Sequence, residues 1–217
     1  MYPVSYEADF QSEQNRATTF FRIILAIPWI IVGVVYAIVA SFTHLFAWVA
    51  VVILGRYPEG LYNLNAGFVR YFVRTSAWIY LQTDEWPPFG ISDDPGYPIR
   101  IEVAPRAERQ SRLKAFFRII LALPMLIVSY AVGYVHQWIA VIAWLTIVFR
   151  GYLPEQINTA MTFCNSFYAR VYGYLALLTD EYPPIGIERA NGLGALAGGP
   201  AAPPQAPPEA PPAAPAV

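Results

Sequence analysis

The sequence is poor in the residues from which most enzyme and metal sites are built. Of its 217 residues one is cysteine and two are histidine, and charged residues make up only 13% of the chain. A single cysteine, Cys164, excludes an internal disulfide and any site that needs several cysteine ligands. The net charge of −1, without a basic cluster that has interleaved aromatic residues, indicates no nucleic acid partner.

Catalytic motifs are missing as well. The chain has no recognisable nucleophile with its base, no phosphate-binding glycine loop and no metal-ligand spacing, so we expect no enzymatic activity, no cofactor and no metal. The two histidines, His44 and His136, do not occupy equivalent positions in the internal repeat described below, which argues against a metal or proton pair. The first 19 residues have three acidic side chains and no apolar core, so we expect no cleavable signal peptide.

Charge is absent from two long stretches, residues 23–55 and 119–149. Each exceeds the roughly 18 apolar residues that mark a membrane segment. Hydrophobic residues make up 56% of the chain and aromatic residues 16%. This composition favours a membrane protein over a soluble one.

The chain contains an internal repeat with an offset of 96 residues. The segment FFRIILAIP (Phe20–Pro28) aligns with FFRIILALP (Phe116–Pro124), and TDEWPPFGI (Thr83–Ile91) aligns with TDEYPPIGI (Thr179–Ile187). Without a gap, 26 of the 72 aligned pairs are identical, which indicates duplication. We therefore divide the chain into an N-terminal arm (1–15), a first membrane repeat (16–91), a polar linker (92–111), a second repeat (112–187) and an Ala/Pro-rich tail (188–217) that we expect to be disordered.

The length of each apolar run leaves two arrangements open. As one helix the run would be about 50 Å long against a hydrocarbon core of about 30 Å, while two crossings would have only about 16 residues each. The most polar part of each run lies at its middle, at Ser41–His44 and at His136–Gln137. A hairpin with its turn there would place every Lys and Arg on one side of the membrane, so the sequence favours a helical hairpin over a single crossing.

A second helix is predicted to begin near Glu59 in the first repeat and near Glu155 in the second. Polar and small residues recur along it at spacings of three and four: Asn63, Gly67, Arg70, Arg74 and Ala77, and more weakly Thr159, Ser166, Arg170 and Gly173. This pattern is typical of an amphipathic helix, which we expect to lie in the membrane interface. The alternative is a spanning helix whose arginine stripe faces a bundle.

Two alternating segments, Tyr2–Phe10 and Tyr97–Pro105, precede the repeats and predict short surface strands. They either pair as a small sheet or remain extended arms. The predicted fold is thus an all-α membrane protein of two tandem repeats, each a hydrophobic helical hairpin plus an amphipathic interfacial helix, with a short surface strand before each repeat.

Two sets of residues recur in both repeats and are candidates for a role. The first is the motif Thr-Asp-Glu-aromatic-Pro-Pro, which we interpret as a structural helix stop, with a two-site cation cluster as the alternative. Its residues are Thr83, Asp84, Glu85, Pro87 and Pro88, and Thr179, Asp180, Glu181, Pro183 and Pro184. The second set could contact lipid headgroups, pair with Glu59 and Glu155, or snorkel without a ligand: Arg22, Arg118, Arg74 and Arg170.

The chain resembles the bacterial membrane family called domain of unknown function 4389 in the order of its motifs. These are R-x5-R with IILA-[IL]-P, an apolar run that closes in G-[RY]-x-P, an aromatic amphipathic helix and TDE-[WY]-PP. The resemblance covers two copies, at about residues 16–91 and 112–187. It implies an integral membrane protein of bacteria without an assigned activity, so no catalytic or binding residues are carried over from the family.

We therefore expect a multi-pass protein of the bacterial cell membrane with its termini in the cytoplasm. Its expected partners are membrane lipids and either another membrane protein or a second copy. The leading function is a non-enzymatic scaffold or accessory subunit of a membrane complex. The alternatives are a small transporter or channel and a membrane-shaping hairpin protein.

Overall fold

The computed structural model describes residues 2–184 and is predominantly helical. The predicted tail and the last three residues of the second repeat lie outside this range. In chain order the elements are β1 (Val4–Ala8), α1 (Arg16–Phe20), α2 (Arg22–Leu25), α3 (Ile27–Leu54), α4 (Glu59–Ile79), β2 (Ile99–Val103), α5 (Arg112–Phe116), α6 (Arg118–Arg150) and α7 (Glu155–Leu175).

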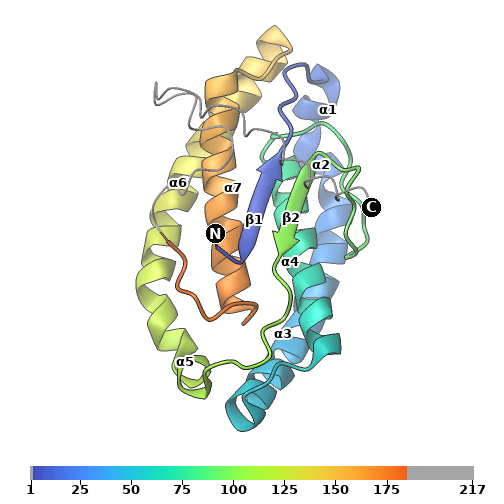
Figure 1. Ribbon diagram of the computed structural model, residues 1–217. Coiled ribbons are helices and arrows are strands. Elements are labelled where there is room, and N and C mark those ends of the chain that lie inside the picture. The colour runs from blue at the N-terminus through green and yellow to red at the C-terminus, as the bar shows by residue number, and fades with distance from the viewer. Residues whose placement is uncertain (1, 185–217) are drawn as a thin grey trace, which may run out of the picture.

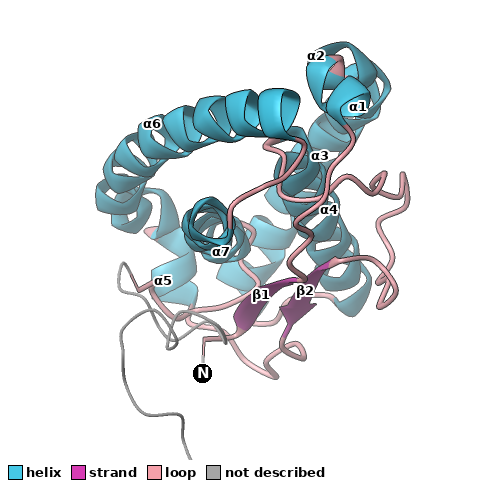
Figure 2. Cartoon of the chain, turned by 90° about the horizontal axis from the view of Figure 1, so that it is seen from above, coloured by secondary structure: helices cyan, strands magenta, loops and turns pink. Residues whose placement is uncertain are grey.

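The elements form three layers. Helices α4 and α7 pack against each other at the centre, and the sheet of β1 and β2 covers one side of them, with β1 against α7 and β2 against α4. The long helices α3 and α6 lie on the side away from the sheet, as Figure 2 shows from above. In Figure 1, α3 and α6 run in opposite directions along the length of the molecule.

The predicted hairpin in each apolar run is wrong, because α3 and α6 are continuous helices of 28 and 33 residues. The polar residues at the middle of α3 do not break it, since they bond to their own helix: Ser41 Oγ donates to the Ala37 carbonyl at 2.7 Å and Thr43 Oγ1 to the Ala40 carbonyl at 3.1 Å. The chain reverses instead after each helix, where Gly55 and Gly151 adopt φ of 67° and 82°. Glycine adopts this left-handed conformation without the steric cost that other residues meet.

The interfacial position predicted for the second helix of each repeat is also wrong, because α4 and α7 are the central layer. More than half of the residues of α4 and of α7 are buried inside the protein. Their periodic patterns arise because one face packs on a long helix and the other lies under the sheet. This is closer to the alternative in which the arginine stripe faces a bundle.

The two predicted strands form and pair with each other, so of the two alternatives the small sheet is the one observed. They are antiparallel, with Tyr6 opposite Ile101 at the centre of the register. Both of these side chains are buried against the helices, whereas Glu7 and Glu102 are exposed on the outer face. The pairing is symmetric about this central pair, since Val4 lies opposite Val103 and Ala8 lies opposite Ile99. An approximate twofold axis therefore passes between Tyr6 and Ile101 and relates the two repeats.

Candidate functional site

Each repeat has a junction at which the arginine before or at the start of its long helix binds the Thr-Asp of the motif that follows its second helix. In the first repeat Arg22 Nη2 donates to Asp84 Oδ1 at 2.8 Å and Arg22 Nη1 to the Thr83 carbonyl at 3.4 Å. The guanidinium lies over the Trp78 ring, 4.5 Å from its centroid. Arg22 is only 2% exposed, and its burial lowers its pKa while Asp84 opposes that shift.

The second repeat reproduces the same contacts. Arg118 Nη2 donates to Asp180 Oδ1 at 3.1 Å and Arg118 Nη1 to the Thr179 carbonyl at 2.9 Å, with the guanidinium 4.1 Å from the centroid of the Tyr174 ring. Arg118 is 3% exposed. Both arginines are therefore engaged inside the protein, which does not favour their predicted contact with lipid headgroups or with Glu59 and Glu155.

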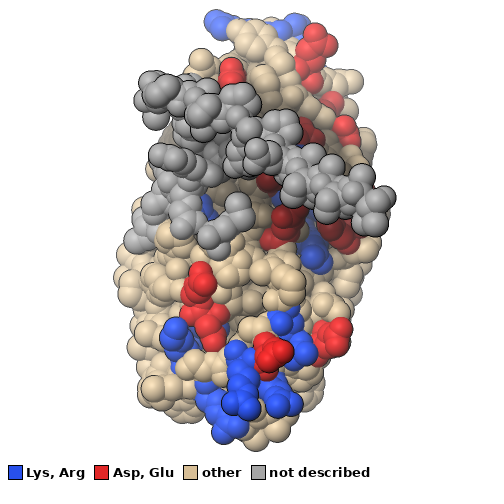
Figure 3. Space-filling model, in the orientation of Figure 1, with Lys and Arg blue, Asp and Glu red and all other residues tan. Residues whose placement is uncertain are grey.

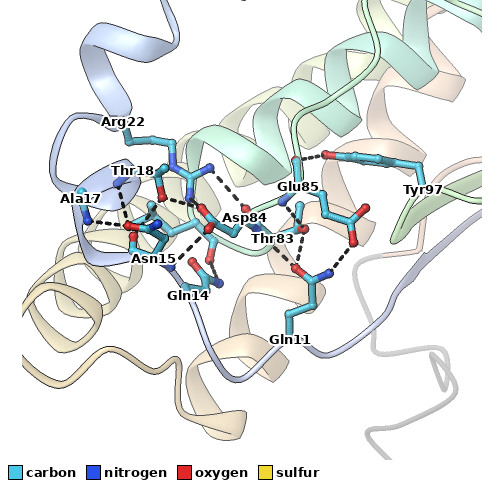
Figure 4. Close-up of polar contacts among 11 residues, drawn as sticks. Gln11, Gln14, Asn15, Ala17, Thr18, Arg22, Thr83, Asp84, Glu85 and Tyr97 are labelled. Atoms are coloured by element: carbon cyan, nitrogen blue, oxygen red, sulfur yellow. Dashed lines mark hydrogen bonds and ion pairs between the residues drawn. The ribbon is translucent and has the colours of Figure 1, made fainter.

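The acidic residue of each motif also holds the start of the preceding short helix. Asp84 Oδ2 accepts from the backbone N–H of Asn15 at 3.2 Å, and Asp180 Oδ2 accepts from that of Ser111 at 2.7 Å. Asn15 and Ser111 are the N-cap residues of α1 and α5. Each aspartate thus joins the arginine, the short helix and the end of α4 or α7, as Figure 4 shows for the first repeat.

The other motif residues close the turn. Thr83 Oγ1 accepts from the backbone N–H of Glu85 at 3.2 Å, and Thr179 Oγ1 accepts from that of Glu181 at 3.0 Å. Pro87 and Pro183 are buried, and Pro88 and Pro184 are half-buried. Asp84 and Asp180 each bind the arginine of their own repeat, so they do not gather into a cation cluster, and a structural role for the motif fits these contacts.

Sequence reasoning missed two glutamines that belong to the same junction. Gln14 Nε2 donates to the Leu81 carbonyl at 3.0 Å, and Gln110 Nε2 donates to the Leu177 carbonyl at 2.8 Å. Both leucines have positive φ, 68° and 61°, although neither is glycine. Since the glutamines are also 96 residues apart, extending the alignment before residue 20 would have revealed them.

The second pair of predicted arginines is not symmetric. Arg74 is 1% exposed; its Nη1 donates to the Ser92 carbonyl at 2.9 Å, and its Nη2 pairs with Asp93 Oδ1 at 3.1 Å. Arg170 is 7% exposed and donates to the Ser166 carbonyl and hydroxyl, both at 3.1 Å. These side chains tie the central helices to the linker and to their own backbone.

A cavity lies between α3, α4 and the end of α7. It has a volume of about 710 Å³ and is open to the outside. Its walls are mostly apolar and include Ile30, Val34, Phe68, Phe72, Ile79 and Leu175. Among residues 2–184, no three His, Cys, Asp or Glu side chains are arranged to hold a metal ion.

Two helices, Ile27–Leu54 and Arg118–Arg150, are long and apolar enough to cross a membrane, by length and composition alone. No curated protein and no solved structure matches the chain. A family model, described as a domain of unknown function (DUF4389), matches residues 16–90 and 112–185. The two matched segments span both helical pairs and both Arg-Asp junctions. The chain therefore belongs to the DUF4389 family and contains that domain twice in tandem.

Proposed function

We propose that the protein is a non-enzymatic membrane protein that lies side-on in one leaflet of the bacterial cell membrane. The observation that carries this proposal is the apolar surface of α3 and α6, which the rest of the described chain leaves uncovered. Large apolar residues with about half or more of their surface exposed occur along the length of both helices: Ile31, Val35, Ile38, Phe42, Phe46 and Ile53, and Ile120, Ile127, Tyr134, Trp138, Ile142 and Phe149. A soluble monomer rarely exposes so large a contiguous apolar patch.

The position of the sheet favours the side-on arrangement over a spanning one. The sheet rests on the middle of α4, because Arg70 and Arg74 donate to the carbonyls of Ile101 and Ile99. That part of α4 lies beside the first half of α3, within the apolar run, since Tyr71 donates to the Trp29 carbonyl and Asn65 accepts from Thr43.

If α3 crossed the bilayer, the sheet would therefore lie at the depth of the hydrocarbon. Its outer edges are unpaired and its outer face carries Glu7 and Glu102. Open sheet edges do not occur in lipid, and an acidic side chain at that depth costs about 2.5–3.5 kcal/mol. When the long helices lie side-on, the three layers are instead stacked along the membrane normal, and the sheet faces water.

Exposed basic residues are placed to meet lipid phosphates in this orientation. One end of the molecule carries Arg56, Arg109, Arg112 and Lys114, and the other carries Arg16 and Arg150. Figure 3 shows Lys and Arg gathered at one end, with others at the opposite end. Each basic residue at an anionic membrane surface contributes about 1 kcal/mol, which favours the cytoplasmic leaflet and an N-terminus in the cytoplasm.

Within this placement, the leading function is a scaffold or accessory subunit of a membrane complex. The described polar groups at the repeated junction bind one another and hold the fold together, rather than surrounding a substrate. The transporter alternative requires a route past Arg74 and Arg170. Neither residue lines the cavity between α3 and α4, the cavity between α6 and α7, or the hollow beside Gly55.

Membrane shaping is a second candidate, and the side-on helices support it. Helices α3 and α6 would be about 42 and 50 Å long, and both would displace lipid from the same leaflet. Such insertion acts as a wedge. Reconstitution at rising protein density into large vesicles is expected to give tubules or small vesicles, and unchanged vesicle diameters would exclude this candidate.

Single-cysteine labelling tests the orientation. Glu13 lies near the C-terminal end of α6, and Glu108 lies near the C-terminal end of α3, at the opposite end of the molecule. Both are exposed, so single cysteines at these positions in a Cys164→Ala background report on which side of the membrane each end lies. In the side-on arrangement, a membrane-impermeant maleimide labels both from the cytoplasmic face of inverted vesicles and neither from intact cells. Labelling from opposite faces would establish a spanning arrangement and contradict the proposal.

Crosslinking in native membranes tests the scaffold function. The matched control is a chain with Glu replacing Ile31, Ile38, Ile120 and Ile127, which interrupts both apolar faces. We expect a membrane-protein partner to be recovered in constant ratio with the native chain and not to be recovered with the control chain. Recovery of the native chain without any partner would contradict a scaffold role.

A further inference from the structure

The duplication creates two equivalent cavities of different size. The first, between α3 and α4, has a volume of about 710 Å³. The second, between α6 and α7, has a volume of about 460 Å³, and its walls include Ser129, Gly133 and Tyr168, the counterparts of Gly33, Ala37 and Phe72 in the first.

Two stacked aromatic side chains lie beside the second cavity, and one of them, Tyr80, lines it. His136 is 1% exposed and stacks on Tyr80, with 4.0 Å between ring centroids and 16° between planes. At the equivalent positions the first cavity has Ala40 and Ala176, which both line it. The larger cavity is therefore lined by two alanines at the positions that a stacked histidine and tyrosine occupy beside the smaller one.

The interior of the first cavity suits hydrocarbon. Three of its polar side chains already have hydrogen-bond partners inside the protein. Ser41 donates to the Ala37 carbonyl, Tyr71 donates to the Trp29 carbonyl, and Asn65 donates to Tyr57 and accepts from Thr43. The remaining walls are largely aliphatic and aromatic. A volume of this size lies within the range of about 300–1,000 Å³ that is usual for ligand sites.

The mouth of the cavity is continuous with the exposed face of α3. Ile30 and Val34 line the cavity, yet they are 50% and 55% exposed. If α3 lies in the leaflet, as in the proposed function on which this inference rests, the mouth opens into acyl chains rather than into water. We propose that the first cavity holds one acyl chain of a bilayer phospholipid, which enters sideways past Ile30 and Val34.

Photo-crosslinking tests the proposal on the full chain in phosphatidylglycerol vesicles. The probe is a trace of phosphatidylglycerol with a diazirine in the middle of one acyl chain, and adducts are located by mass spectrometry. The outer residues Ile31 and Ile127 report contact with bulk lipid, whereas Phe72 and Ser76 line the cavity on α4. We expect adducts at both sets of residues.

The matched variant carries Ala40→His with Ala176→Tyr, which places the stacked pair found beside the second cavity into the wall of the first and reduces its volume. We expect it to lose the adducts at Phe72 and Ser76 and to keep those at Ile31 and Ile127. Protection of the buried Cys164 thiol confirms that the variant is folded. If it does not fold, His136→Ala serves instead, and it is expected to gain adducts at Tyr168.

Each other outcome contradicts a defined part of the proposal. Three results would overturn the acyl-chain site. They are outer adducts without cavity adducts, cavity adducts that persist in the variant with Ala40→His and Ala176→Tyr, and no gain of adducts at Tyr168 in His136→Ala. No adducts on either outer helix overturn the proposed membrane placement instead. If a diazirine fatty acid labels Phe72 and Ser76 and the phospholipid does not, the ligand is a free fatty acid and a bilayer phospholipid is excluded.

Discussion

Gly173 on α7 lies so close to Val4 on β1 that a Cβ atom at Gly173 would be 2.6 Å from Val4 Cγ2. The absence of a side chain at Gly173 therefore lets the first strand of the chain pack directly on the last helix. Both residues are buried, and Val4 is only 2% exposed. In the first repeat the equivalent of Gly173 is Ala77, which packs with the core under the sheet.

Gly173→Ala is accordingly expected to destabilise the protein, by about 1–3 kcal/mol, because an extra methyl in a tightly packed site forces the strand away from the helix. Chemical unfolding in detergent measures the free energy of unfolding. Combining it with Val4→Ala removes the opposing methyl groups, so the double variant should lose less than the sum of the two single variants. Additive losses would show that the two side chains do not oppose each other.

Asp84→Asn is expected to reduce the free energy of unfolding by about 2–3 kcal/mol, since it leaves the buried Arg22 guanidinium without its counterion. Asp93→Asn is the matched control. Asp93 also binds a buried arginine, but its side chain is 62% exposed and Arg74 keeps two carbonyl partners. A loss of less than about 1 kcal/mol is expected there. Equal losses would contradict the special role of the repeated junction.

Gly151→Ala is expected to destabilise the protein by about 1–2 kcal/mol through backbone strain. Its φ is 82°, and a Cβ atom there would lie 2.9 Å from Arg16 Nε, so the arginine at the start of α1 must also move. Gly60→Ala is the control, because nothing lies within 4 Å of its Cβ position inside α4. Alanine there should leave stability unchanged or raise it by up to about 1 kcal/mol, as thermal unfolding would reveal.

Cys164 should report unfolding through its reactivity and its pH dependence. The thiol is 1% exposed, and burial raises its pKa from 9.0 to about 11. At pH 8 we expect slow reaction with a thiol reagent in the folded protein and fast reaction after unfolding.

The sign of the pH effect on stability follows from that shift. Between pH 9 and 11 the unfolded chain loses the thiol proton while the folded protein keeps it, so stability falls as pH rises through this range. Cys164→Ala should remove this component of the alkaline loss when unfolding is measured at pH 8 and pH 10. The same loss in both proteins would show that the thiol does not contribute.

Several features followed from the sequence because they depend on local patterns. The alternation around Tyr6 and Ile101 predicted the strands, and the offset of 96 residues predicted that Arg22 and Arg118 have equivalent roles. The apolar runs indicated helices long enough for a membrane. Hydrogen bonds within a helix and side-chain alternation along a strand involve residues near one another in the chain, so the sequence alone reveals them.

The sequence did not determine where those elements turn or what they cover. Ser41–His44 looked like a turn by polarity, yet nothing there forces the helix to stop, whereas Gly55 with its positive φ does. The sequence likewise did not show which partner each buried arginine would find.

Tertiary structure alone decided that Arg22 meets Asp84, 62 residues away, and that the sheet covers the middle of α4. It also decided that Ala40 and Ala176 line one cavity while their counterparts His136 and Tyr80 stack on each other beside the other. These relationships join residues far apart in the chain. A buried charge needs a partner, and a closely packed interior leaves space only where small residues meet, so these outcomes depend on how the helices pack.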